Sequence, residues 1–262
     1  MSAPTLFPQF KRRNHGRGHS YYIDGEKVDG VTTLLGDGAR KKALEAWNGN
    51  VVADYAVDHW DELSKLPFSQ RLDRLKKSRY EVRDEAARRG SEVHNLAEQI
   101  LRGEEVAVPD ELAGHVESAV RFMDEWEVEE LLVEAPGVNL EHRYGGTFDL
   151  LFRSRRFPGR TFLADWKTSK DIYGETALQL EAYSRFDFVL GTGGGEVPLS
   201  EFGITDHVAI HIKADTYVVY PMQRGDDVWQ RFLATAASAR ANRKDDIEAL
   251  RGDAMYLPGV AA

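Results

Sequence analysis

Three charged side chains fall in two consecutive apolar segments, and their types and spacing suit phosphodiester hydrolysis. Asp149 lies in GGTFDLLF, and Asp165 and Lys167 lie in TFLADWK. Both segments predict strands, and the two-residue spacing puts Asp165 and Lys167 on the same strand face. Hard divalent cations prefer carboxylate oxygens and accept substrate phosphates. The two segments therefore predict a metal site with an ammonium group beside it.

Asp165 and Lys167 stand in an otherwise apolar strand, where an unpaired charge is costly to bury. A structural ion pair is one explanation, but a metal ligand beside a cation fits their shared face better. The lysine would then orient or deprotonate the attacking water, or stabilise charge in the transition state. Asp149 follows a stretch of small residues, GGT, that lets a ligand approach closely. Taken alone, Asp149 is explained more simply as the end of a strand or a turn cap.

Three further polar residues lie on expected helices. His94 shares a helix face with apolar positions of RRGSEVHNLAEQIL, which points it inward or into a cleft, where histidines are usually core residues. Glu98, one turn later, is placed to orient the His94 ring. Gln179 and Tyr183 are four residues apart on the helix after the lysine strand, so they share one face. That face would contact a phosphate or local backbone groups.

The expected elements alternate between helical and extended texture along the chain. After a basic arm or edge through residue 18, a hairpin turns at Asp24-Gly25, and helices follow at 41–61, 69–101 and 110–130. Strands are expected at 131–140, 145–152 and 161–167, a helix at 175–190, strands at 207–214 and 216–222, and a helix at 226–251. This order predicts an α/β protein with a mixed central sheet flanked by helices and a largely helical N-terminal half. One domain, 1–262, is expected, with a hairpin and helices in 1–130, the sheet core in 131–225, and a helix and tail in 226–262.

Composition excludes several classes of protein. The chain has no cysteine, which rules out disulfides, thiolate zinc sites and iron–sulfur clusters. A net charge of -9 argues against coating nucleic acid by bulk electrostatics, so a DNA enzyme would need local basic patches. No apolar run suits a membrane span or a secretory leader, so the cytoplasm is expected. Three basic patches are present: Lys11, Arg12, Arg13 and Arg17; Arg71, Arg74, Lys76, Lys77, Arg79, Arg83, Arg88 and Arg89; and Arg153, Arg155, Arg156 and Arg160.

The three patches differ in what they suggest. Acidic residues interleave the second patch, which favours a solvated helix face over a binding surface. The third patch falls in the turn between the two acidic strands and is therefore more suggestive of a role at the site.

Taken in chain order, the polar segments resemble the RecB-like branch of the PD-(D/E)XK nuclease superfamily, close to the Cas4-like phage exonucleases. The resemblance rests on GSEVH, GGTFD, ADWK and QLEAY, between about residues 90 and 183, with a weaker match in HSYYIDGEKVDGVTTLL. It implies a restriction-endonuclease-like fold. It also implies that Mg²⁺ or Mn²⁺ is held by His94, Asp149, Asp165 and the main-chain carbonyl of Trp166. Lys167 would be the catalytic lysine, Gln179 and Tyr183 would hold the DNA strand or the site geometry, and Glu134 and Glu141 are candidates for a second metal.

The resemblance implies a DNA exonuclease acting on DNA ends or single strands in recombination, repair or replication. Phage recombination or replication proteins would be its partners, no membrane contact is expected, an oligomer is compatible, and the compartment would be the host cytoplasm. Cas4 and AddB relatives carry four cysteines for an iron–sulfur cluster, and their absence here favours a stand-alone enzyme. Two alternatives stay open: a catalytically inactive DNA-binding or assembly subunit with the same fold, and an RNA or nucleotide phosphohydrolase.

Overall fold

A mixed sheet forms the centre of the computed structural model, which describes residues 9–16, 18–39, 42–191 and 193–253. Its described strands are β1 (Phe10–His15), β2 (Gly18–Ile23), β3 (Glu26–Gly30), β4 (Val128–Asn139), β5 (Tyr144–Ser154), β6 (Thr161–Lys167), β7 (Phe188–Leu190), β8 (Glu196–Pro198), β9 (Asp206–Ile212) and β10 (Tyr217–Met222). The described α-helices are α1 (Val31–Gly38), α2 (Lys42–Asp58), α3 (Trp60–Leu63), α4 (Phe68–Leu101), α5 (Ala113–Glu125), α6 (Glu175–Ser184), α7 (Asp226–Ala241) and α8 (Lys244–Glu248), with short 3₁₀ helices at Asp110–Leu112 and Leu199–Phe202.

Four neighbouring strands carry the core of the sheet. β4, β5 and β6 form an antiparallel meander, and β9 then adds to β6 in the parallel direction. The chain crosses from β6 to β9 through α6, as parallel neighbours require. The first six residues of β6 are buried, which matches its near-continuous apolar sequence, because a strand covered on both faces cannot alternate.

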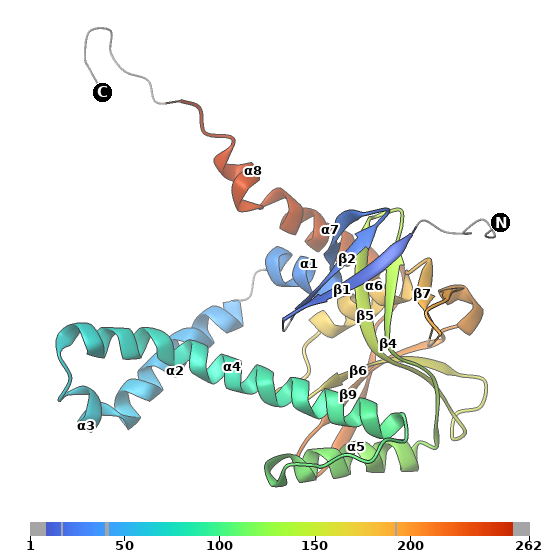
Figure 1. The fold of residues 1–262 in the computed structure, drawn as a ribbon, viewed down its shortest axis with the longest axis horizontal. Coiled ribbons are helices and arrows are strands. Elements are labelled where there is room, and N and C mark those ends of the chain that lie inside the picture. The colour runs from blue at the N-terminus through green and yellow to red at the C-terminus, as the bar shows by residue number, and fades with distance from the viewer. Residues whose placement is uncertain (1–8, 17, 40–41, 192, 254–262) are drawn as a thin grey trace.

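Helices cover both faces of the sheet (Figure 1). On one face, the C-terminal half of α4 and α5 pack on β5, β6 and β9 through Val93, Phe122, Phe152, Trp166 and Ile210. On the other face, α1, α6 and α7 pack through Leu34, Phe148, Leu163, Leu180 and Phe232. The α/β class and the mixed sheet flanked by helices, expected from the sequence, are therefore confirmed. No helix in the described parts of the chain is long and apolar enough to cross a bilayer.

Residues 10–15, expected as a basic mobile arm or edge, form edge strand β1, whose Phe10 is buried on Tyr21 and Phe188. Three other local expectations need correction. The hairpin strand ends at Gly30, because Leu34 and Leu35 are buried under α6 and α7 as part of helix α1. The helix expected to reach residue 190 ends at Ser184, since 188–190 pair with β4 as β7. The C-terminal helix is divided into α7 and α8.

Acid should destabilise the folded chain through His207 on β9. Its ring is fully buried, neither ring nitrogen has a hydrogen-bond partner, and burial, helped by Arg224, lowers its pKa to about 3. Below pH 6.5, His207 binds a proton in the unfolded chain but not in the folded chain. Its contribution to the free energy of unfolding therefore falls by up to ~1.4 kcal/mol per pH unit down to about pH 3. Relative to His207→Gln, the wild type should lose up to ~2 kcal/mol of stability between pH 7.5 and pH 5.0 in urea unfolding, because the comparison cancels the opposite effect of the raised carboxylate pKa values. Equal drops in both proteins would contradict this.

Candidate metal centre and active site

The candidate site lies where β5 and β6 stop pairing. Their ladder ends at Leu150 and Ala164, and the residues next in line are Asp149 and Asp165. Past this point the Asp149 side chain takes the place of a backbone hydrogen-bond acceptor. Its Oδ2 accepts a hydrogen bond from the Trp166 N–H at 2.8 Å. The end of the ladder thus brings two acidic residues from neighbouring strands together, as the sequence predicted.

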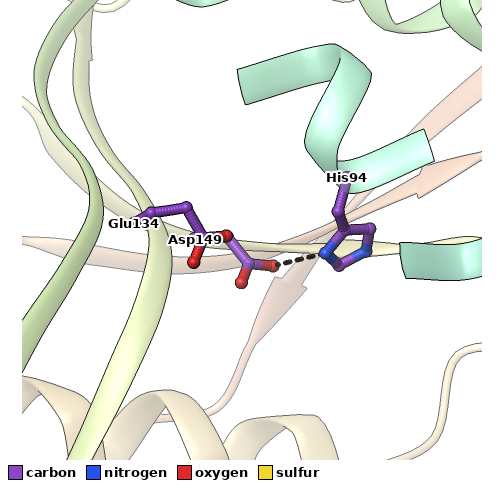
Figure 2. A group of neighbouring side chains, drawn as sticks. All are labelled: His94, Glu134 and Asp149. Atoms are coloured by element: carbon purple, nitrogen blue, oxygen red, sulfur yellow. Dashed lines mark ion pairs between the residues drawn. The ribbon is translucent and has the colours of Figure 1, made fainter. Parts of the chain in front are cut away.

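A second carboxylate and an imidazole meet Asp149 on its open side. Figure 2 shows Glu134 from β4, Asp149 from β5 and His94 from α4 pointing toward one another. One ligand atom from each lies within 4.8 Å of the other two, and His94 Nδ1 is 3.7 Å from Asp149 Oδ2. We call this group the His94–Glu134–Asp149 cluster. It is drawn from three elements that are distant in the sequence.

The backbone of β4 turns Glu134 toward the cluster. Val133 and Ala135 pair with Leu150 and Phe148, which puts Glu134 opposite Asp149. Glu134 has a φ of 48°, in the left-handed region that non-glycine residues seldom adopt. A conformation of this kind costs roughly 1–3 kcal/mol and is concentrated at functional sites. The strain at Glu134 is therefore explained if the position of its carboxylate matters for function.

Asp165 belongs to a neighbouring hydrogen-bonded chain of side chains. Its carboxylate is only 2% exposed, and Oδ2 lies 2.5 Å from Lys167 Nζ. Gln179 Nε2 donates to Asp165 Oδ1 at 2.8 Å and to the Tyr183 hydroxyl at 3.1 Å, while Gln179 Oε1 accepts from Lys167 Nζ at 3.2 Å. The expected face of α6 therefore does cross the lysine strand. Its two polar residues hold Asp165 and Lys167 in place.

Crowded carboxylates shift the protonation of the site. Burial and the nearby charge of Asp149 raise the pKa of Glu134 to about 8. Burial and the charge of Asp165 likewise raise the pKa of Asp149 to about 6. Although burial opposes it, attraction to Asp165 and Asp149 raises the pKa of Lys167, so its ammonium form is favoured. Shifts of this kind gather where a fold is built for chemistry or ion binding.

The donor set fits a hard or borderline divalent cation. One imidazole and two carboxylates offer nitrogen and oxygen ligands, and burial together with neighbouring carboxylate charge raises the pKa of both Glu134 and Asp149. Asp165 Oδ2 is buried and pairs with the Lys167 ammonium at 2.5 Å. A cation among these groups would relieve the repulsion between the carboxylates.

The predicted residues divide into two groups in the structure. His94 and Asp149 join Glu134 in the cluster, whereas the Asp165 carboxylate is held by Lys167 and Gln179. Trp166 adjoins the cluster through its N–H, and a role for its carbonyl stays a prediction. Three assignments around this core also change, for Glu141, Glu98 and the third basic patch.

The first is Glu141, a second-metal candidate, which lies outside the cluster on an exposed turn beside His142. Glu98 pairs with Arg102 at 2.5 Å instead of orienting His94. In the third basic patch, Arg156 pairs with Glu127 and Arg160 with Asp206, away from the cluster.

The N-terminal hairpin contributes residues that sequence patterns did not assign to the site. Tyr21 on β2 shares hydrogen bonds with Thr147 (2.9 Å) and His19 (2.8 Å), and Thr147 is two residues from Asp149 on β5. The positive charge of Arg12 on β1 lowers the pKa of Glu134 against the opposing effects there. Tyr21 also lines a groove of about 900 Å³, whose lining includes none of the cluster residues and neither Asp165 nor Lys167. Only the basic character of the arm hinted at this contribution.

Gly146→Ala should damage the site without touching a charged residue. A Cβ at position 146 would lie 2.5 Å from the Tyr183 ring and 3.0 Å from Phe186, so Tyr183 and the Gln179 bonded to it must move. We expect a loss of ~1–3 kcal/mol in stability from overpacking. Thermal unfolding measures this loss. Gly36→Ala on α1 has open space around it and is the control; equal behaviour of the two variants would refute the packing argument.

Comparisons with known proteins leave the family of this chain open. No protein-family model and no curated protein matches it. Among solved structures, it is similar to a protein designated SSO0001, with a TM-score of 0.32 and 13% identity over 82% of this chain and 76% of that one. It is also similar to an alkaline exonuclease from Laribacter hongkongensis, with a TM-score of 0.30 and 16% identity over 61% of this chain and 81% of the other. Similarities this low carry no conclusion about function.

Proposed function

We propose that this chain is a divalent-metal-dependent deoxyribonuclease that hydrolyses phosphodiester bonds, acting as an exonuclease of the RecB-like PD-(D/E)XK type. The supporting observation is the meeting of the His94–Glu134–Asp149 cluster with the Asp165–Lys167 pair at one strand end. A cluster with two carboxylates beside a buried ion pair is hard to explain as packing, because buried charge is costly without a purpose. One catalytic domain spanning the chain is part of the proposal.

In this mechanism His94, Glu134, Asp149 and the nearby Asp165 would hold Mg²⁺ or Mn²⁺, with the Trp166 carbonyl as a further ligand. The cation supplies Lewis acidity toward the scissile phosphate and lowers the pKa of water. Lys167 directs its ammonium toward the attacking water and the charge that develops on phosphorus oxygens. Gln179 fixes Asp165 and Lys167 together, and Tyr183 fixes Gln179. The buried setting strengthens each of these electrostatic effects.

End-labelled linear DNA, closed circular DNA and RNA, each with Mg²⁺ and with EDTA, test the proposal. We expect linear DNA to be degraded from its ends with Mg²⁺ and to stay intact with EDTA. Degradation of the circle would replace the exonuclease assignment with an endonuclease. Preference for RNA would change the substrate class, and intact DNA under all conditions would favour a non-catalytic DNA-binding role.

A further inference from the structure

The middle of α4 is exposed to solvent on every described side. Residues 80–85 and 87–89 are all exposed, whereas Ser78 before them and Val93 after them are buried. Figure 1 shows why: α2, α3 and the start of α4 extend away from the sheet, and the middle of α4 lies between them and the sheet. Arg71 secures the outer end by donating to the carbonyls of Leu63, Ser64 and Leu66. A long helix without a covered face needs a function other than packing.

One side of this exposed stretch leads directly to His94. Counting back from His94 at about 100° per residue, Ala87, Arg83, Tyr80 and Lys76 all fall within about 40° of its direction. Gly90 lies on the same side, and a Cβ there would be 3.1 Å from Thr168 Oγ1, next to Lys167. We call Lys76, Arg79, Tyr80 and Arg83 the α4 row. It ends at the residues proposed to do the chemistry.

The α4 row combines a flat aromatic ring with positive charge. Tyr80 is 43% exposed, and the guanidiniums of Arg79 and Arg83 lie 4.6 Å and 5.2 Å from its ring centroid. Between residues 68 and 83 there are six basic and two acidic residues, in a chain whose net charge is -9. Arg83 also pairs with the adjacent Asp84 at 2.7 Å, and Arg88 is held by three acids, Glu85, Glu92 and Glu111. The solvated-face interpretation therefore suits the end of the second basic patch best, where acidic partners are most numerous.

We propose that the α4 row is a track that binds single-stranded nucleic acid and leads it to the metal centre, an inference that rests on the proposed nuclease function. Unpaired bases stack on exposed aromatic rings while basic side chains follow the phosphates, and a duplex hides its base faces. From His94 to Lys76 the helix rises about 27 Å, which is long enough for several nucleotides of an extended strand. The track therefore contacts the strand several nucleotides away from the scissile bond.

Binding of a fluorescent 20-nucleotide thymidine strand, followed by anisotropy in EDTA, tests the track without cleavage. Tyr80→Ala should weaken binding about fivefold or more, since stacking contributes ~1–3 kcal/mol per base. Lys76→Ala/Arg83→Ala should weaken binding and reduce the salt slope by about 1.4. The control, Arg74→Ala/Lys77→Ala, removes the same charges from other sides of α4, beside Tyr55 and His59, and should change affinity less than twofold. Equal losses in both double variants, or none in Tyr80→Ala, would overturn the track; the second outcome would point to a protein-binding face.

Cleavage separates this inference from the proposed function. Wild-type protein should cut a 20-nucleotide strand with a higher kcat/KM than a dinucleotide, which is too short to reach Tyr80, and track variants should lower that ratio. Thermal unfolding verifies that the variants fold. If all variants keep the wild-type ratio, the track is wrong and the nuclease stands. If the wild type cuts neither strand, both proposals fall.

Discussion

Lys167→Ala should reduce DNA cleavage by about 10²–10⁴-fold, because it removes the charged group that faces the attacking water and the developing phosphate charge. The substitution also leaves Asp165 buried, with only Gln179 as a partner. Breaking a buried ion pair in this way destabilises a fold by roughly 3–5 kcal/mol. A lower melting temperature is therefore expected alongside the lost activity.

Lys167→Arg separates these two effects. Its guanidinium keeps the charge beside Asp165, so the melting temperature should stay near that of the wild type, while the altered shape and donor geometry should still lower turnover more than tenfold. Initial rates on end-labelled linear DNA and differential scanning calorimetry give the two quantities. Full activity in the folded arginine variant would show that the lysine is structural and not catalytic.

Glu134→Gln should weaken Mn²⁺ binding at least about tenfold to a hundredfold, since loss of a ligand exceeds the usual effect of disturbing a ligand's partner. The loss should depend on pH. With a pKa of about 8, Glu134 is largely protonated at pH 7, and the cation must displace that proton. Wild-type affinity should therefore rise between pH 6 and 8.5, and the rise should be smaller in Glu134→Gln.

Isothermal titration with Mn²⁺ at several pH values measures both effects. Glu141→Gln is the matched control, because Glu141 was an equal candidate from the sequence but lies on an exposed turn outside the cluster. Its affinity and pH profile should match those of the wild type. If Glu134→Gln binds as the wild type does, while Asp165→Asn does not, the ligand set is that implied by the family resemblance, without Glu134.

The grouping of the Asp165, Lys167, Gln179 and Tyr183 side chains could be predicted from the sequence, because it depends on the local periodicity of one strand and one helix. Strand alternation puts Asp165 and Lys167 on one face of β6, and helix spacing puts Gln179 and Tyr183 on one face of α6. The short connection between the two elements brings the helix back over the strand. The mixed sheet flanked by helices followed from the alternation of apolar segments with helical ones. The hydrogen bonds among these four side chains are the expected consequence.

The place of Glu134 in the site and the contacts of the N-terminal hairpin could not be predicted from the sequence, because both depend on tertiary structure. The place of Glu134 follows from strand register and a left-handed residue, neither of which a periodic pattern reveals. The sequence of strand β1 is mostly polar. The strand forms because it pairs with β2 and because its Phe10 packs on the Phe188 ring. Residues 31–38 favoured a strand by their β-branched start, yet burial of Leu34 and Leu35 against α6 and α7 overrides that preference.

Anomalous diffraction from a crystal soaked in Mn²⁺ tests the central claim most directly. We expect one strong peak within ligand distance of His94, Glu134 and Asp149, with the Asp165 carboxylate beside it, and we expect Glu134→Gln to weaken that peak. A peak elsewhere on the molecule, or none at these side chains in well-ordered crystals at saturating Mn²⁺, would contradict the metal centre and the hydrolytic chemistry built on it.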